Sequence, residues 1–273
     1  MTTRFKKKPQ KGLLPLGISF LFAWLILASC SGDQLVQDYF YRAEQAFASG
    51  ELQQAAHFYE LFLENEQDSP NRIIAWERLL LIYLDIGRDV DLGMNVLKSM
   101  SVEYEKERDK LWSIIIRMAQ LYAQQKKFES SIETFEKAIK IAGDDKQLIL
   151  AYLEIAEVYY KRSDFLMVLE VLNDSLKSVS FPSPDQQGRI NYLLGKTHYQ
   201  LKDKDSAIYY LLKTLYSDAG ENQRSKAGIL LYDVYMEESN VESANRVLNE
   251  LEKFYPNPMV IRMRQDDISN EIN

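Results

Sequence analysis

Residues 112–143 read WSIIIRMAQLYAQQKKFESSIETFEKAIKIAG, and the spacing of their apolar residues indicates the fold class of the chain. Its apolar residues recur at three- and four-residue spacing, at Ile115, Met118, Ala119 and Tyr122. This spacing is typical of an amphipathic helix, which has one apolar side. Beyond the polar QQKK, Ser131 is followed four positions later by Phe135, again on one helical face. The segment therefore predicts two helices that pack against each other as a hairpin.

The pattern of the second helix repeats along the chain. In five places a small residue precedes an aromatic residue or leucine by four positions, and Val168 with Leu172 fills the remaining interval. The six pairs, 37 to 39 residues apart, are Ala55/Tyr59, Gly93/Leu97, Ser131/Phe135, Val168/Leu172, Ala207/Leu211 and Ala244/Leu248. Small side chains let two helices approach closely while larger neighbours interlock. The repeat therefore predicts six helical hairpins that bury their apolar sides against one another.

Two more series of residues follow the same period in the first helix of each hairpin. One consists of Ala46, Tyr83, Tyr122, Tyr159, His198 and Tyr235. The other, three residues earlier, consists of Ala43, Leu80, Ala119, Ala156, Gly195 and Tyr232. The second hairpin needs one extra residue before Gly93 to stay in register with the others.

These series resemble the tetratricopeptide repeat, which has small residues at its eighth and twentieth positions and tyrosine at its eleventh. The resemblance covers residues 36–258 and implies an all-α fold, a right-handed superhelical solenoid of six tetratricopeptide-like hairpins. The repeats start near residues 36, 73, 112, 149, 188 and 225. They are longer than the family's 34 residues, and Leu80 and Tyr232 replace the usual small residue. Residues 259–273, with Ile261 and Ile268 at near-helical spacing, are expected to form a helix that caps the last hairpin.

Capping residues mark several of the expected helix starts. Ser69-Pro70 and Ser183-Pro184 have the pattern of an N-cap followed by proline at the first helical position. Asp164 and Asn240 are expected to cap the second helices of the fourth and sixth hairpins.

The N-terminus has the pattern of an export signal. Residues 1–12 are cationic, and residues 13–27 are almost wholly apolar but too short to span the hydrocarbon core of a membrane. Leu27-Ala28-Ser29-Cys30 then resembles the lipobox of bacterial lipoproteins. That resemblance implies a signal peptide at 1–29, a lipid on Cys30, a short tether at 30–35 and attachment to a membrane. In the lipoproteins of enteric bacteria, aspartate after the cysteine resembles a signal for retention in the inner membrane. By that resemblance, Ser31 implies the outer membrane, with the chain facing the periplasm.

The rest of the chain excludes some classes of function. Beyond residue 29 the formal charge is about −12, which argues against nucleic acid as a partner because phosphate binding needs clustered lysine and arginine. His57 and His198 lie in different hairpins, no cysteine or histidine cluster has metal-ligand spacing, and Leu194-Gly195-Lys196-Thr197 lacks the earlier glycine of a phosphate-binding loop. We therefore expect no catalytic residue, no metal and no cofactor. The oligomeric state is left open.

The family resemblance also implies a binding surface. In tetratricopeptide solenoids the first helix of each hairpin faces an inner groove through its second, fifth, ninth and twelfth positions. The candidate groove residues here are Glu157, Tyr160, Arg189, Tyr192, Lys196, Tyr199, Asp233 and Met236. Tyrosines among charged residues suit a peptide or helix ligand.

We therefore expect a membrane-anchored scaffold that binds proteins in the bacterial cell envelope and aids outer-membrane assembly. Repeat one resembles the opening of the BamD-type lipoproteins of the β-barrel assembly machine. Two alternatives stay open. One is a pilotin-type lipoprotein that assists secretin assembly, and the other is a lipoprotein that captures a small molecule or glycan.

Overall fold

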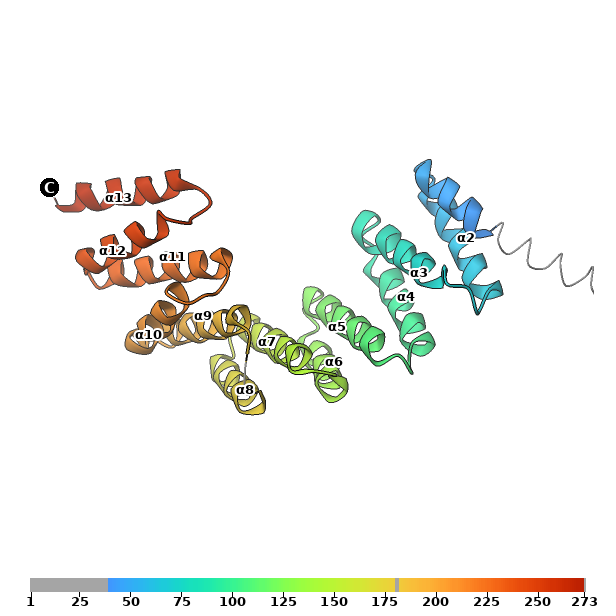
Figure 1. The fold of residues 1–273 in the computed structure, drawn as a ribbon, viewed down its shortest axis with the longest axis horizontal. Helices are drawn as coiled ribbons and strands as arrows, with labels where there is room; N and C mark the ends of the chain where they lie inside the picture. Colours follow the sequence, from blue (N-terminus) through green and yellow to red (C-terminus); the bar gives the residue numbers. More distant parts are fainter. Residues whose placement is uncertain (1–38, 180–181, 273) are drawn as a thin grey trace, which may run out of the picture. The chain divides into compact units, whose positions relative to one another are not determined.

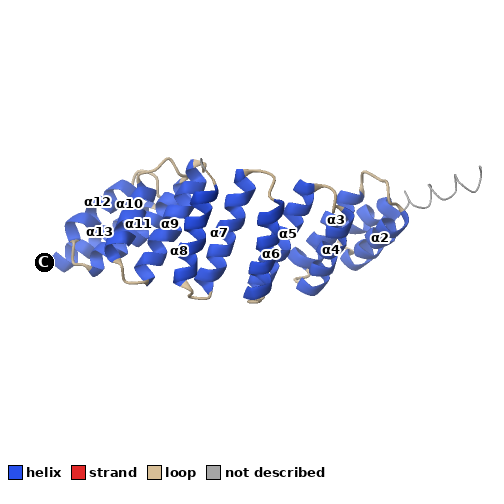
Figure 2. Ribbon diagram, turned by 90° about the horizontal axis from the view of Figure 1, so that it is seen from below, coloured by secondary structure: helices blue, strands red, loops and turns tan. Residues whose placement is uncertain are grey.

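The structure, a computed structural model, describes residues 39–179 and 182–272. Every regular element in these ranges is a helix, and no strand occurs in them (Figure 2). The prediction of an all-α fold is therefore confirmed. No helix in the described ranges is both long enough and apolar enough to cross a membrane. The signal peptide, Cys30 and the tether expected within residues 1–35 lie outside these ranges.

The chain divides into two units, and the boundary between Val96 and Leu97 falls inside one helix. The described part of unit 1 begins with a helix at residues 39–48, which we leave unlabelled. It continues with α2 (Leu52–Asn65), α3 (Arg72–Leu80), the π-helix η1 (Leu81–Ile86) and the first part of α4 (Val90–Glu103) (Figure 1).

A buried tyrosine ties the first three helices of unit 1 together. Tyr59 on α2 is fully buried, and its hydroxyl donates a 2.5 Å hydrogen bond to Glu44 on the helix at 39–48. The same carboxylate accepts from Arg78 of α3, whose Nε lies 3.2 Å from Glu44 Oε1. Phe40 packs on Tyr59 and Phe62, with ring centroids 6.2 Å and 5.1 Å apart. A polar link and an aromatic cluster thus stabilise the same three-helix contact.

The extra residue of the second hairpin lies in η1. The amide of Gly87 donates to the carbonyl of Ile82 at 2.8 Å, five residues back, as in a π-helix rather than an α-helix. The wider turn takes up one residue between Leu80 and Gly93. Both of those residues remain buried, so the insertion does not displace either of the flanking series.

Each hairpin turn contains one residue in the left-handed region. These residues are Gly50, Arg88, Lys126, Ser163, Lys202 and Ser239, and they follow the period of the repeat. After the left-handed residue the chain closes with a main-chain bond to the first helix, as in a Schellman motif. The Lys127 amide, for example, donates to the Tyr122 carbonyl at 2.9 Å. Five of the six residues are not glycine, so the main-chain bonds compensate the steric cost of a side chain there.

Unit 2 consists of four further hairpins and a final helix (Figure 1). Its elements after α4 are α5 (Arg108–Gln124), α6 (Phe128–Ile141), α7 (Asp145–Lys161), α8 (Phe165–Ser178), α9 (Pro184–Gln200), α10 (Lys204–Leu215), α11 (Glu221–Glu237), α12 (Val241–Leu251) and α13 (Pro258–Ile272).

The core of unit 2 is built from the residues that define the repeat. All eight members of the small–large pairs in this unit are fully buried: Ser131, Phe135, Val168, Leu172, Ala207, Leu211, Ala244 and Leu248. The first helices of successive hairpins also contact one another, α5 with α7, α7 with α9 and α9 with α11. These first helices therefore form one continuous face of the unit.

The capping predictions are confirmed at Ser183 and Asn240, correct in position alone at Asp164, which is the N-cap residue of α8, and wrong at Ser69. Ser183 and Gln186 form a complete capping box on α9, and the Asn240 side chain accepts from the Ser243 amide at 3.1 Å. Asp164 makes no side-chain capping bond. Ser69 is not an N-cap, because its hydroxyl accepts from Asn71 instead and α3 begins only at Arg72.

The last helix, α13, packs on α12. Ile261 and Ile268 are 0% and 1% exposed, and they belong to the same apolar cluster as Leu248 and Leu251. On the polar side, Arg264 forms a 2.8 Å ion pair with Asp233 of α11. The helix thus covers the apolar side of the sixth hairpin.

Candidate protein-binding groove

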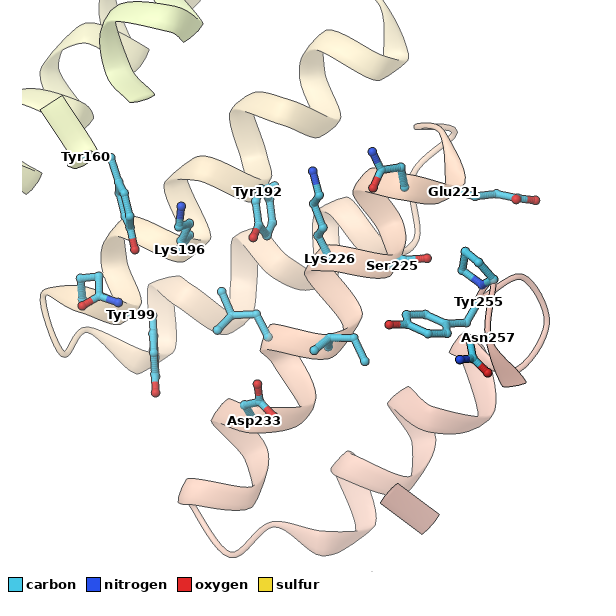
Figure 3. A pocket seen from close by; sticks show the side chains of 15 residues that line it. Tyr160, Tyr192, Lys196, Tyr199, Glu221, Ser225, Lys226, Asp233, Tyr255 and Asn257 are labelled. Atoms are coloured by element: carbon cyan, nitrogen blue, oxygen red, sulfur yellow. The ribbon is translucent and has the colours of Figure 1, made fainter. Parts of the chain in front are cut away.

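The first helices of the last three hairpins, together with one loop, surround a hollow of about 770 Å³ in unit 2 (Figure 3). We call it the C-terminal hollow. Its lining residues are Tyr160, Tyr192, Lys196, Tyr199, Gln200, Glu221, Asn222, Ser225, Lys226, Ile229, Leu230, Asp233, Tyr255, Pro256 and Asn257. They come from α7, α9, α11 and the loop between α12 and α13.

Four tyrosines give the C-terminal hollow its aromatic character. Burial raises the pKa of Tyr160 and of Tyr192, so both hydroxyls stay neutral under ordinary conditions. The Tyr199 hydroxyl donates to the Glu237 carboxylate, and this bond is the main cause that raises its pKa to about 12. Tyr255 projects from the loop on the opposite side (Figure 3). Rigid rings of this kind bury a large area at low entropic cost.

Two lysines lie among these rings. The Nζ of Lys196 is 3.6 Å from the ring centroid of Tyr160, a close cation–π contact. Burial lowers the pKa of Lys196, although the nearby charge of Glu157 partly opposes that effect. Lys226, one helix further on, is exposed. Neither ammonium has a carboxylate within ion-pair distance among the described residues.

Asp233, one of the acidic residues that line the hollow, already has an ion-pair partner. Asp233 binds Arg264 of α13, whose guanidinium also lies 4.7 Å from the ring centroid of Tyr232. The loop that carries Tyr255 is held by Arg224, which stacks 4.0 Å from the centroid of Phe254 and pairs with Glu250 at 3.6 Å. The C-terminal elements therefore complete the hollow and neutralise part of its negative charge.

One polar atom in the lining has no partner. Ser225 is 6% exposed, and its hydroxyl makes no hydrogen bond with any described residue. A serine inside a helix commonly donates to the carbonyl four residues back. Here that bond is absent, so the hydroxyl of this lining residue is a buried donor without a hydrogen-bond partner among the described residues.

The structure brings together five of the eight candidate groove residues. Tyr160, Tyr192, Lys196, Tyr199 and Asp233 all line the C-terminal hollow. Their role in binding stays a prediction.

The other three candidates lie outside the lining. Arg189 contacts Glu154 on α7 at 3.5 Å, and Met236 packs against the apolar cluster formed by α10 to α13. Glu157 is near enough for its charge to oppose part of the burial effect that lowers the pKa of Lys196, and to add to the burial effect that raises the pKa of Tyr192.

Sequence reasoning missed Ser225, Tyr255 and Asn257. Ser225 falls outside the four groove-facing positions of the repeat. Tyr255 and Asn257 flank Pro256 in a segment that the sequence marks only as a boundary, and no pattern indicates that this loop folds back over α11.

A second hollow, of about 880 Å³, lies within unit 1. Glu51, His57, Glu60 and Asp89 are among the residues that line it. The hydroxyl of Tyr83 in η1 donates to Glu60 at 2.7 Å, and burial is the main cause that raises the pKa of Tyr83.

The two histidines are far apart in the sequence and have different surroundings. His198 stacks on Tyr210 with ring centroids 5.5 Å apart, and its Nδ1 lies 3.0 Å from an Asp203 carboxylate oxygen. It therefore fills the position that tyrosine holds in other hairpins. Among the described residues, no group of three or more histidine, cysteine or acidic side chains could hold a metal ion.

Comparison with known families identifies the repeat. Residues 113–145 and 188–221 match the family model of the tetratricopeptide repeat. These segments correspond to the third and fifth hairpins, so the chain contains tetratricopeptide repeats. Among curated proteins, the chain is 26% identical over 112 residues to the human protein named RRP5 homolog. The match covers 40% of this chain but only 6% of that protein, so the chain spans a small part of its relative's length.

Solved structures with the same fold include proteins with different printed roles. PilW, described as a type IV pilus biogenesis factor, aligns with a TM-score of 0.51 at 15% identity, over 85% of this chain and 99% of PilW. The N-terminal domain of the EccA1 ATPase from the ESX-1 secretion system of Mycobacterium tuberculosis aligns with a TM-score of 0.53 at 14% identity, over 88% of this chain and 91% of that domain. The nearly identical TPR-like repeats of a putative kinesin light chain from Podosopora anserina align with a TM-score of 0.50 at 15% identity, over 68% of this chain and 96% of that chain. At these identities the likeness shows the fold alone, and it confirms a tetratricopeptide-like helical repeat.

Proposed function

We propose that this chain is a scaffold that binds a segment of a partner protein in the C-terminal hollow. The observation that carries the proposal is the convergence of Tyr160, Tyr192 and Tyr199, from two successive hairpins, on one hollow with an unpaired lysine. Tetratricopeptide proteins are in general non-catalytic scaffolds. Aromatic anchors beside unpaired polar groups are the features that give protein interfaces most of their binding free energy.

We further propose that the scaffold works at a bacterial membrane, attached through a lipid on Cys30. The support is the sequence Leu27-Ala28-Ser29-Cys30 after a short apolar segment. Aid to outer-membrane protein assembly remains the favoured role. The alternative of a pilotin-type role in secretin assembly stays open, and PilW, described as a type IV pilus biogenesis factor, shares the fold of this chain.

Site-specific crosslinking in cells tests the proposed binding surface. A photoreactive phenylalanine analogue replaces Tyr160 or Tyr192 in separate variants, and mass spectrometry identifies the adducts. Tyr209 on α10 is the matched control, because it is a tyrosine of the same unit that is 58% exposed and absent from the hollow. We expect a discrete protein adduct from the hollow positions and none from Tyr209.

Equal adducts from all three positions, or none from Tyr160 and Tyr192, would contradict the proposal. An adduct with a glycan or another small molecule would favour the ligand-capture alternative. Membrane attachment is tested separately with Cys30→Ala, which should move the folded protein from the membrane fraction to the soluble fraction. Retention in the membrane fraction would contradict the lipid anchor.

A further inference from the structure

We propose that Lys196 and Lys226 bind an acidic side chain of the partner, an aspartate or glutamate within an internal segment that lies along the C-terminal hollow. This inference rests on the proposed function and specifies the chemistry of the partner.

The first argument is that these two lysines, unlike three arginines near them, have no carboxylate partner among the described residues. Arg189 on α9 pairs with Glu154, Arg224 on α11 pairs with Glu250, and Arg264 of α13 pairs with Asp233 in the lining. Lys196 has only the face of Tyr160, and Lys226 has no ion pair with any described residue. A partly buried ammonium without a counter-ion loses hydration and gains little in return. A bound carboxylate would supply that missing partner.

The second argument concerns the acidic groups of the hollow. Asp233 already forms an ion pair with Arg264. Glu221 is exposed at the start of α11, where the helix dipole favours a negative charge. Glu157 influences Lys196 at longer range but forms no ion pair with it. The described carboxylates therefore leave both ammonium groups available to a ligand, in a chain whose overall charge is −7.

The third argument is the Ser225 hydroxyl. Ser225 belongs to the same lining as Lys226, and its hydroxyl is almost fully buried and has no hydrogen-bond partner among the described residues. Buried polar groups in native structures are normally satisfied, so an unsatisfied donor in a lined hollow indicates a missing acceptor. A carboxylate has two oxygens and can accept from several donors at once.

The position of the lysines selects an internal acidic residue rather than a chain end. Figure 3 shows Lys196 and Lys226 between Tyr160 at one end of the hollow and Tyr255 at the other. Tyr192 lies between these ends as well, and Ile229 and Leu230 add apolar surface to the lining. Residues both before and after the acidic one therefore find a contact surface, whereas a terminal carboxylate would leave one side empty.

Selection from a peptide library tests the proposal. The probe is a phage library of random twelve-residue peptides fused to the coat protein through their C-termini, so that no free peptide carboxylate is present. We expect selected peptides to share an aspartate or glutamate at one position among apolar or aromatic residues. Against the Lys196→Glu, Lys226→Glu double variant, the preference at that position should change to lysine or arginine.

Binding of one selected peptide, with an amidated C-terminus, is then measured by fluorescence anisotropy. Lys196→Gln should weaken binding about tenfold or more, because it removes a charge-assisted hydrogen bond. The matched control is Lys213→Gln on α10, since Lys213 is an exposed lysine that also lies over a tyrosine ring, 5.9 Å from the centroid of Tyr209. This control should leave the affinity unchanged. Circular dichroism confirms that each variant is folded.

The outcomes separate the two proposals. Peptides that bind and respond to Tyr192→Ala, but show no acidic preference or ignore Lys196→Gln, would overturn this inference and leave the proposed function intact. An acidic preference that appears only with a library of free C-termini would assign the site to a terminal carboxylate and overturn the internal-residue proposal. Failure to select any peptide that responds to Tyr192→Ala would overturn both.

Discussion

A Cβ atom added to Gly195 would lie 2.8 Å from Cγ and 3.0 Å from Cδ2 of Leu211. The two residues belong to the two helices of the fifth hairpin, α9 and α10. The same Cβ would be 3.2 Å from the carbonyl oxygen of Ala207, which is part of the backbone and cannot rotate away. The close approach of these helices is therefore possible because the first one has no side chain at this point.

Gly195→Ala should destabilise unit 2. Leu211 is fully buried, so its side chain has no free space into which to move. Overpacking costs about 1–3 kcal/mol, and replacing glycine by alanine in a helix returns about 0.5–1 kcal/mol, so we expect a net loss of about 1–2 kcal/mol. Thermal unfolding followed by circular dichroism measures it. Gly143→Ala is the control, because its added Cβ meets only two side-chain oxygens at 3.4 Å; an equal loss in both variants would refute the steric explanation.

Ser183→Ala should destabilise the start of α9. The Ser183 hydroxyl accepts from the Gln186 amide, and the Gln186 side chain accepts from the Ser183 amide at 3.0 Å. Loss of such a cap costs about 1 kcal/mol. Ser178→Ala is the control, because Ser178 is exposed at the end of α8 and donates only to the Asp174 carbonyl. Hydrogen exchange of the first turn of α9 should accelerate in the first variant alone, and unchanged protection there would contradict the prediction.

Tyr59 should make unit 1 sensitive to alkali. Burial, followed by the hydrogen bond to Glu44, raises the pKa of Tyr59 well above its ordinary value of 10.0. Between these two pKa values the folded state holds one more proton than the unfolded state, so the free energy of unfolding falls as pH rises above 10. Below pH 10 the contribution is fully present. Tyr59→Phe should cost about 1 kcal/mol at neutral pH, and its deficit relative to the wild type should shrink between pH 9 and pH 11.

The free energy of unfolding of unit 1 is measured at each pH by unfolding the protein with urea and following the fluorescence of Trp76. A chain that starts at residue 31 and carries Trp112→Phe leaves Trp76 as the only tryptophan. Tyr41→Phe is the control, since Tyr41 is 62% exposed. If the deficit of Tyr59→Phe stayed constant across this pH range, the shifted ionisation of Tyr59 would be disproved.

Lys196→Met should stabilise the chain while it weakens ligand binding. Burial disfavours the charged form of Lys196 and lowers its pKa below 10.5 in the folded state. In the range between the two pKa values the unfolded state binds more protons, so the wild type gains stability as pH rises toward 10.5. Methionine is uncharged, so its burial at this position does not carry the cost of burying a charge. We therefore expect a higher melting temperature for Lys196→Met at pH 7 and a smaller difference from the wild type near pH 10, and a lower melting temperature at pH 7 would contradict this.

Much of the fold could be predicted because it depends on residue size at fixed spacing. The pairs Ser131/Phe135 and Ala207/Leu211 are fully buried, as two closely packed helices require. The left-handed turn residues could not be predicted. Sequence rules expect glycine or asparagine there, and only Gly50 conforms, whereas Lys126 and Lys202 adopt the same conformation with a full side chain.

The candidate groove was predictable where a helix position decides which way a side chain points. Tyr192, Lys196 and Tyr199 recur at three- and four-residue spacing on one face of α9, and all three line the C-terminal hollow. Arg189 lies on the same helix, but its long side chain reaches Glu154 on the neighbouring α7 instead. Tyr255 was not predictable, because its place depends on how the loop after α12 returns over α11.

The π-helix η1 shows how the repeat can accommodate the insertion of one residue. In the other five hairpins the closing bond of the turn spans five residues, as from Lys127 to Tyr122, but in the second it spans six, from Asp89 to Tyr83. A single inserted codon is therefore accommodated within one wide turn, and the buried positions before and after it keep their partners. Homologous chains should gain or lose one residue at this point with little effect on the neighbouring repeats, so η1 marks a site where evolution can alter the period without rebuilding the core.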